Sequence, residues 1–138
     1  MKEEKGLSFV AIMIIIALTS LFLRFAVDQL IKVSIAQNEA NAQETLKLLS
    51  VALENYAKDH LGVYPAAISE LTISNPPYLD KDYTNESFLK GYDYSCSRIE
   101  SSGYSCFAMP TRCKLTGNNN FVITTGGSLT SEDCAKKE

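Results

Sequence analysis

The sequence predicts an α+β fold in which one long N-terminal helix packs on a small three-stranded antiparallel sheet. No glycine or proline interrupts the chain between Gly6 and Gly62, whereas the last third alternates aromatic and polar residues in short runs. The chain has 138 residues and a net charge of −3. This length leaves room for one domain with a small core.

The most apolar stretch covers residues 7–23, which read LSFVAIMIIIALTSLFL and carry no charge. As a helix it would extend roughly 25 Å, and continuing it to Val27 gives about 31 Å. A bilayer hydrocarbon core is about 30 Å thick. Arg24 is the one charge in the extension, and its long stem can carry the guanidinium to the headgroups. We therefore expect residues 7–27 to cross a membrane.

The helix is expected to continue from about residue 7 to 61, because this stretch contains neither of the two strong helix breakers. Polar residues appear from Asp28 onward. An apolar stripe persists at helical spacing: Ile31, Ile35, Ala42, Leu46, Leu49, Leu53 and Tyr56. The stripe predicts that residues 28–61 pack on the domain that follows, although a stalk or coiled coil would show the same periodicity.

Residues 62–90 read as a loop that begins with helix-stopping residues. Gly62 suits the end of a helix, and Pro65 prevents continuation. Residues 66–71 (AAISEL) predict one short helical turn. His60, the sole histidine, lies in the last turn of the long helix, where a structural or solvated role is expected.

Residues 91–138 are expected to form the sheet and a C-terminal loop. Alternation predicts strands over 91–97 and 103–110, joined by a hairpin turn at 100–103. A third strand is predicted over 120–125, ending at Gly126 and Gly127.

Four cysteines lie in the last third of the chain: Cys96, Cys106, Cys113 and Cys134. An even number in an exported domain favours disulfides, and the lack of CxxC spacing argues against zinc. Three pairings are possible. A hairpin centred on Ser101 would place Cys96 opposite Cys106, and Cys113 and Cys134 would then bracket the last strand. We favour this pairing.

Catalysis and nucleic-acid binding find no support in the sequence. It has no phosphate loop, no nucleophile elbow and no paired carboxylates with an evident pocket. A basic stripe with interleaved aromatics, which would indicate nucleic acid, is also missing. We expect a protein that is not an enzyme and that needs no cofactor.

The charged leader MKEEKG ends in Gly6, immediately before the apolar run. This arrangement resembles the signal of type IV prepilins and of type II secretion pseudopilins. The resemblance implies that residues 1–6 are a leader, that a prepilin peptidase cuts after Gly6, and that Leu7 becomes the N-methylated first residue. A plain signal anchor would be equally apolar.

The helix exit carries a second resemblance, formed by Tyr56, Gly62, Tyr64 and Pro65. A tyrosine near the helix end followed by Gly and Tyr-Pro is similar to the corner after the long helix of the major pseudopilin. The order of long helix, irregular loop and antiparallel strands likewise matches the pilin fold. The Cys113 and Cys134 bracket is similar to the C-terminal disulfide loop of many type IV pilins, and it could add roughly 3 kcal/mol.

Two features bear on how closely the family's properties carry over. Counted from Leu7, the fifth residue is Ala11, where family members usually have a glutamate that pairs with a neighbour's N-terminal amine. This departure suggests a minor or tip-proximal subunit, or a lineage in which that amine pairing is dispensable. Major pseudopilins also bind calcium in a C-terminal loop. The candidate oxygens here are those of Asn118, Asn119, Asn120, Ser128, Glu132 and Asp133. Because calcium prefers several carboxylates in one loop, we expect a solvated loop rather than a metal site.

The resemblance implies a structural subunit of a pilus-like filament, in the first place a type II secretion pseudopilin that supports protein export. The alternatives are a major or minor type IV pilin for adhesion, motility or DNA uptake, and an anchored protein that never polymerises. Expected partners are other pilin-like subunits, the prepilin peptidase, an inner-membrane assembly platform and lipid. The expected location is the bacterial inner membrane, with the C-terminal domain in the periplasm or on the surface.

Overall fold

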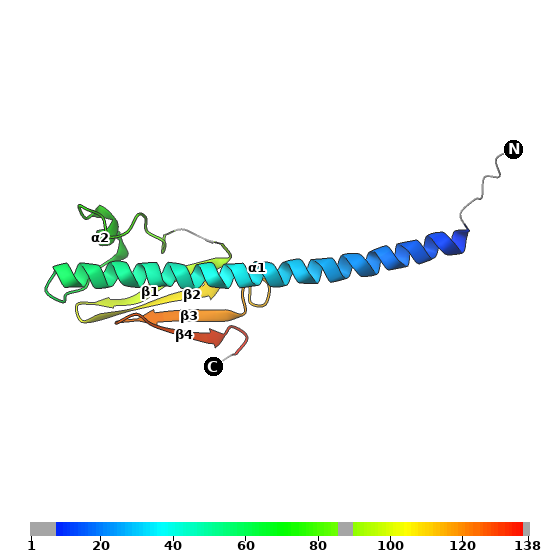
Figure 1. The fold of residues 1–138 in the computed structure, drawn as a ribbon. Coiled ribbons are helices and arrows are strands. Elements are labelled where there is room, and N and C mark those ends of the chain that lie inside the picture. Colours follow the sequence, from blue (N-terminus) through cyan, green and yellow to red (C-terminus); the bar gives the residue numbers. More distant parts are fainter. Residues whose placement is uncertain (1–7, 86–89, 137–138) are drawn as a thin grey trace. The chain divides into compact units, whose positions relative to one another are not determined.

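The computed structural model describes residues 8–85 and 90–136, and it has the α+β architecture that the sequence predicts (Figure 1). Two helices precede four strands: α1 (Phe9–Asp59), α2 (Ile68–Ile73), β1 (Tyr92–Glu100), β2 (Gly103–Pro110), β3 (Asn119–Thr124) and β4 (Ser128–Asp133). The chain forms two compact units, one up to Val33 and one from Ser34 onward.

Helix α1 ends earlier than expected. It stops at Asp59 rather than at residue 61, and the expected start at Leu7 lies outside the described residues. The backbone turns out of the helix at Leu61, which has a φ of 59°, and Gly62 follows with a φ of 85°. The Gly62 amide donates to the Ala57 carbonyl at 2.7 Å. This is the six-residue closure of a Schellman turn, so Leu61 takes the left-handed position that glycine usually holds.

The sheet has four strands in the order β1-β2-β3-β4, all antiparallel, where the sequence predicts three. Strand β4 was missed because it is a polar edge strand in which Leu129 is the only large apolar residue. The turn at Gly126 and Gly127 does not end the sheet, because it returns the chain as a hairpin in which Thr124 pairs with Ser128.

A bulge in β1 sets which side chains face the core. Glu100 pairs with Gly103 across a two-residue turn, which by itself would place Cys96 opposite Phe107. The pairing shifts by one residue between Cys96 and Arg98, so Ser97 has no partner and Cys96 lies opposite Cys106. Because alternate residues face opposite sides of a strand, the bulge lets both Cys96 and Ile99 pack against the core.

The core of the second unit lies between the second half of α1 and one face of the sheet. The helix contributes Ala42, Leu46, Leu49 and Leu53, and the strands contribute Tyr92, Tyr94, Tyr104, Cys106, Ala108, Phe121 and Ile123. Ile68 and Leu71 of α2, together with Leu79, extend this cluster. From Ala42 onward, the apolar stripe of residues 28–61 is thus covered by the domain that follows it. The short helix in the 62–90 segment covers residues 68–73, two positions later than expected.

Candidate functional site

The N-terminal part of α1 carries the largest apolar surface of the described chain. Its most apolar stretch of 18 residues contains no buried residue. Phe22 is 81% exposed and Phe25 is 68% exposed. Exposed apolar patches of this size mark membrane or protein contacts. The length and composition of α1 allow it to cross a membrane.

Two of the polar side chains within this segment, those of Thr19 and Ser20, are satisfied inside the helix itself. The Thr19 hydroxyl donates to the carbonyls of Ile15 at 2.9 Å and Ile16 at 3.0 Å. The Ser20 hydroxyl donates to the Ala17 carbonyl at 2.9 Å. Side chains that bond back to their own helix need no water, so they are compatible with surrounding lipid or packed helices.

Among the positions expected to matter for processing and assembly, the structure describes only Ala11. Gly6 and Leu7 lie outside the described residues. Ala11 lies in the first turn of α1 and is partly exposed. Its methyl side chain offers no group that could pair with an amine.

The tyrosines at the helix end tie α1 to the segment that follows it. Tyr56 stacks on His60 with ring centroids 3.9 Å apart and donates a hydrogen bond to Glu70 of α2 at 3.3 Å. Tyr78 meets the Tyr56 ring edge-on at 5.5 Å and donates to Asp59 at 2.6 Å. The corner therefore consists of aromatic rings in contact with one another, and the tyrosine hydroxyls donate hydrogen bonds to carboxylates.

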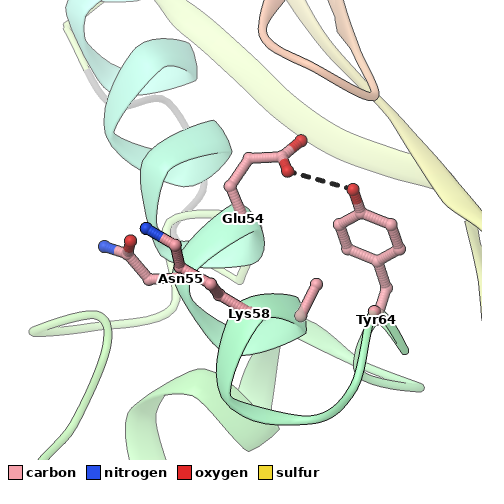
Figure 2. Close-up of a pocket in the computed structure, with 6 residues that line it drawn as sticks. Glu54, Asn55, Lys58 and Tyr64 are labelled. Carbon is pink, nitrogen blue, oxygen red and sulfur yellow. Dashed lines mark hydrogen bonds between the residues drawn. The ribbon is translucent and has the colours of Figure 1, made fainter.

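Glu54 organises the other side of the corner, beside a hollow of about 430 Å³ lined by Glu54, Asn55, Ala57, Lys58, Gly62 and Tyr64 (Figure 2). The Tyr64 hydroxyl donates to Oε2 of Glu54 at 3.1 Å. The Tyr104 hydroxyl and the Gly126 amide donate to Oε1 at 3.1 and 2.8 Å. Pro65 is fully buried. Of the predicted corner residues, the structure brings Tyr64 into this cluster and Tyr56 into the one with α2.

A second contact joins α1 to the C-terminal region. Oε1 of Glu39 accepts hydrogen bonds from the Asn118 amide at 2.7 Å and from Nδ2 of Asn119 at 3.3 Å. Asn38 donates to the Thr116 carbonyl at 2.9 Å. Glu39 and Glu54 lie at opposite ends of the packed half of α1, and sequence reasoning singled out neither. The signal was present, because both acids flank the apolar stripe and so face the sheet margin.

The cysteines pair as the sequence favours, Cys96 with Cys106 and Cys113 with Cys134. The first disulfide joins opposed residues of β1 and β2. The second joins the loop before β3 to the residue after β4. Lys114 lies 2.8 Å from Asp133 beside this link. The hydrogen bond from Lys114 lowers the pKa of the Asp133 carboxyl.

Both carboxylates among the calcium candidates lie beside lysines: Asp133 pairs with Lys114, and Glu132 lies 3.9 Å from Lys136. Asn118 and Asn119 contact Glu39 through N–H groups, the backbone amide of Asn118 and Nδ2 of Asn119. Within the described ranges, one set of three potential metal ligands lies close together: Cys113, Asp133 and Cys134. Because its two sulfurs form a disulfide, this set offers a metal one carboxylate.

Comparison with known proteins gives no match: no family model, no curated protein and no solved structure is significantly similar to this chain. The features that bear on function are therefore α1, its exposed apolar surface and the domain packed on its second half.

Proposed function

We propose that this chain is a membrane-anchored structural subunit that polymerises through α1 into a pilus-like filament. The observation that carries the proposal is the difference between the two parts of the single helix α1. Its first part is apolar with no buried residue in its most apolar 18 residues. Its second part packs on the sheet through Leu46, Leu49 and Leu53.

The physical basis is that the apolar part of α1 must remain out of water in both states. In the bilayer it is covered by lipid, and in a filament it would be covered by the same segments of other copies. Moving a helix from lipid to a helix bundle leaves no apolar surface in water, so packing and specific contacts decide the balance. The internally bonded Thr19 and Ser20 add no unpaired polar group in either state.

Within this class we favour a type II secretion pseudopilin over a type IV pilin. The small domain and the Tyr56, Gly62, Tyr64 and Pro65 corner support this choice. Ala11 supports a minor or tip-proximal position, because a subunit without a carboxylate there cannot pair with the N-terminal amine of a copy above it. The proposed location is the bacterial inner membrane, with the domain exported.

The proposal is tested by N-terminal sequencing and intact-mass analysis of the protein from membranes of its native host. A chain that begins at N-methylated Leu7 and retains the whole of α1 is the expected result. A chain that keeps Met1, or one cut after the apolar run, would contradict the processing on which a pilin-like subunit depends.

A further inference from the structure

The loop that joins β2 to β3, residues 111–118, is fixed to the beginning of the packed half of α1. Asn38 donates a hydrogen bond to the Thr116 carbonyl at 2.9 Å. The Asn118 amide donates to the Glu39 carboxylate at 2.7 Å. The β2–β3 loop therefore lies at the end of the second unit by which α1 enters it.

This end of the second unit is closely tethered to the segment that is expected to cross the membrane. The second unit begins at Ser34, and the expected membrane segment ends at Val27. Residues 28–33 connect the two. If α1 is anchored as proposed, this short connection holds the β2–β3 loop near the bilayer surface. The loop then has a high effective concentration towards the lipid headgroups, so a contact that would be weak between separate molecules becomes significant.

The β2–β3 loop is closed by its own hydrogen bonds and by a disulfide. The Arg112 carbonyl accepts from the Leu115 amide at 3.1 Å, and the Lys114 amide donates to the Gly117 carbonyl at 2.8 Å. Lys114 has a left-handed φ of 68° within this turn. The Cys113–Cys134 disulfide ties the loop to the end of β4. A loop that is constrained in this way loses little conformational freedom when it binds.

The tip of the loop presents one apolar and one cationic side chain. Leu115 is 55% exposed, and Arg112 is exposed as well. Among the residues that the structure describes, the Arg112 side chain has no hydrogen-bond or ion-pair partner. A guanidinium matches the geometry of a phosphate group, and exposed leucines favour the boundary between headgroups and acyl chains. The pair therefore fits the surface of a phospholipid bilayer.

The other charges near the loop leave Arg112 as its available cation. Glu132 and Asp133 lie beside Lys136 and Lys114, so their charges are matched. Asp93 of β1 is a further exposed acid at this end. The electrostatic part of a membrane contact would therefore depend mainly on Arg112.

The opposite end of the second unit has an excess of acids. There the helix exit meets the β1–β2 turn, where the Tyr64 amide donates to the Ser101 carbonyl at 3.3 Å. Lys58 is the neighbouring cation. The acids at this end are Glu54, Asp59, Glu70 and Glu100. An anionic membrane surface repels such an end, so the charge distribution favours the β2–β3 loop as the end that faces the bilayer.

We propose that the β2–β3 loop contacts the bilayer in which α1 is anchored. In this contact the Arg112 guanidinium binds the phosphate of a phospholipid headgroup, and Leu115 enters the interfacial layer. The inference rests on the membrane anchor of the proposed function and extends it to the exported domain. The contact would hold the domain against the membrane before assembly, and it would have to break when the chain leaves the bilayer.

The first test places a photo-cross-linking benzoylphenylalanine at Leu115 of the full-length chain in nanodiscs of phosphatidylethanolamine and phosphatidylglycerol. Mass spectrometry then measures the fraction of chain that carries a phospholipid adduct. The matched control has the same group at Ile73, which is 80% exposed and lies in α2, away from the loop. Position 115 should give at least about fivefold more adduct than position 73. Equal yields would overturn the inference.

The second test combines the cross-linker at Leu115 with a charge reversal. Arg112→Glu should lower the adduct yield about fivefold or more, because one attractive charge near an anionic surface becomes repulsive. Lys58→Glu changes the net charge by the same amount at the opposite end and should leave the yield unchanged. High salt should reduce the difference between the two variants, because it screens the surface charge. Equal yields in the two variants at low salt would contradict the role of Arg112.

The outcomes separate failure of this contact from failure of the proposed function. A chain that is not retained in the nanodiscs contradicts the membrane anchor and so the proposed function. A retained chain that gives equal adducts at positions 115 and 73 shows that the contact alone is wrong. In membranes of the native host, a cross-link from position 115 to a second protein in place of lipid would assign the loop to a protein partner and would also overturn the inference.

Discussion

The carboxylate of Glu54 accepts a hydrogen bond from the Tyr64 hydroxyl at 3.1 Å and so holds the chain leaving α1 against the helix itself (Figure 2). The same carboxylate accepts from Tyr104 of β2 and from Gly126 between β3 and β4. One side chain therefore fixes the helix exit, the hairpin and the last turn of the sheet.

Replacing Glu54 with alanine should lower the free energy of unfolding by about 2–3 kcal/mol, because three donors lose their acceptor at a partly buried site. Tyrosine fluorescence of the full-length chain in detergent micelles can follow urea unfolding. All seven tyrosines lie between residues 56 and 104 and the chain has no tryptophan, so the signal reports on the second unit. Glu44→Ala, at an exposed position of the same helix, should change the value by less than about 0.5 kcal/mol. Equal losses in the two variants would show that Glu54 has no special role.

Alkaline pH should unfold the second unit through its buried tyrosines, among them Tyr92, whose pKa is raised further, and Tyr104. The Tyr104 hydroxyl is buried, and burial together with the hydrogen bond to Glu54 raises its pKa to about 12. Because the folded pKa exceeds the unfolded value, the stabilisation is complete below pH 10 and is lost as the pH rises from about 10 to about 12. An absorbance titration at tyrosinate wavelengths should contain a component near pH 12 that Tyr104→Phe removes. A titration of all seven tyrosines near pH 10 in the folded chain would contradict the geometry.

Leu61 offers a stabilising substitution. Its φ of 59° lies in the left-handed region, and it is 99% exposed, so its side chain contributes almost no packing. Leu61→Gly should raise the free energy of unfolding by about 1 kcal/mol through relief of this backbone strain. Leu61→Ala keeps the β-carbon and should give little gain. A stabilisation by alanine equal to that by glycine would mean that backbone strain is not the cause.

Loss of the Cys113–Cys134 disulfide should destabilise the second unit, but the sheet should remain folded. The link closes a sequence separation of 21 residues. The double variant with serine at both positions should lose about 3 kcal/mol, the chain-entropy value for a loop of this size. The Glu39 contacts to Asn118 and Asn119 remain and should preserve the near-ultraviolet circular dichroism. If the double variant gave the spectrum of an unfolded chain at low temperature, the fold would depend on the disulfide and not on the Glu39 contacts.

The helix and the first three strands were predictable because each depends on residues close in sequence, and the disulfide pairing followed from the positions of those strands. Symmetry about the predicted turn gives Cys96 its actual partner, although the turn is placed differently in the structure. A hairpin centred on Ser101 pairs Cys96 with Cys106, whereas the actual turn lies between Glu100 and Gly103 and the bulge at Ser97 corrects the register. Symmetry about a turn gives no sign of a bulge.

What the sequence did not predict depends on distant contacts. Strand β4 has little apolar periodicity, so its strand form comes from backbone pairing with β3 and from the Cys113–Cys134 link that holds its end. The roles of Glu54 and Glu39 likewise depend on partners 10 to 80 residues away in the chain. From the sequence alone, a carboxylate beside an apolar stripe is expected to be solvated. Its structural role becomes visible only when the fold places hydrogen-bond donors around it.

In the proposed assembly, α1 first anchors each chain in the membrane and then packs against α1 of other copies in a filament outside the membrane. A pulse of isotopic label followed by separation of membranes and sheared filaments from the native host tests this claim most directly. The label should enter the membrane fraction first and then pass into the filament fraction. After the leader is removed, the mass of the labelled chain should not change between the two fractions. Label that stays in the membrane as a monomer throughout the chase would contradict the account.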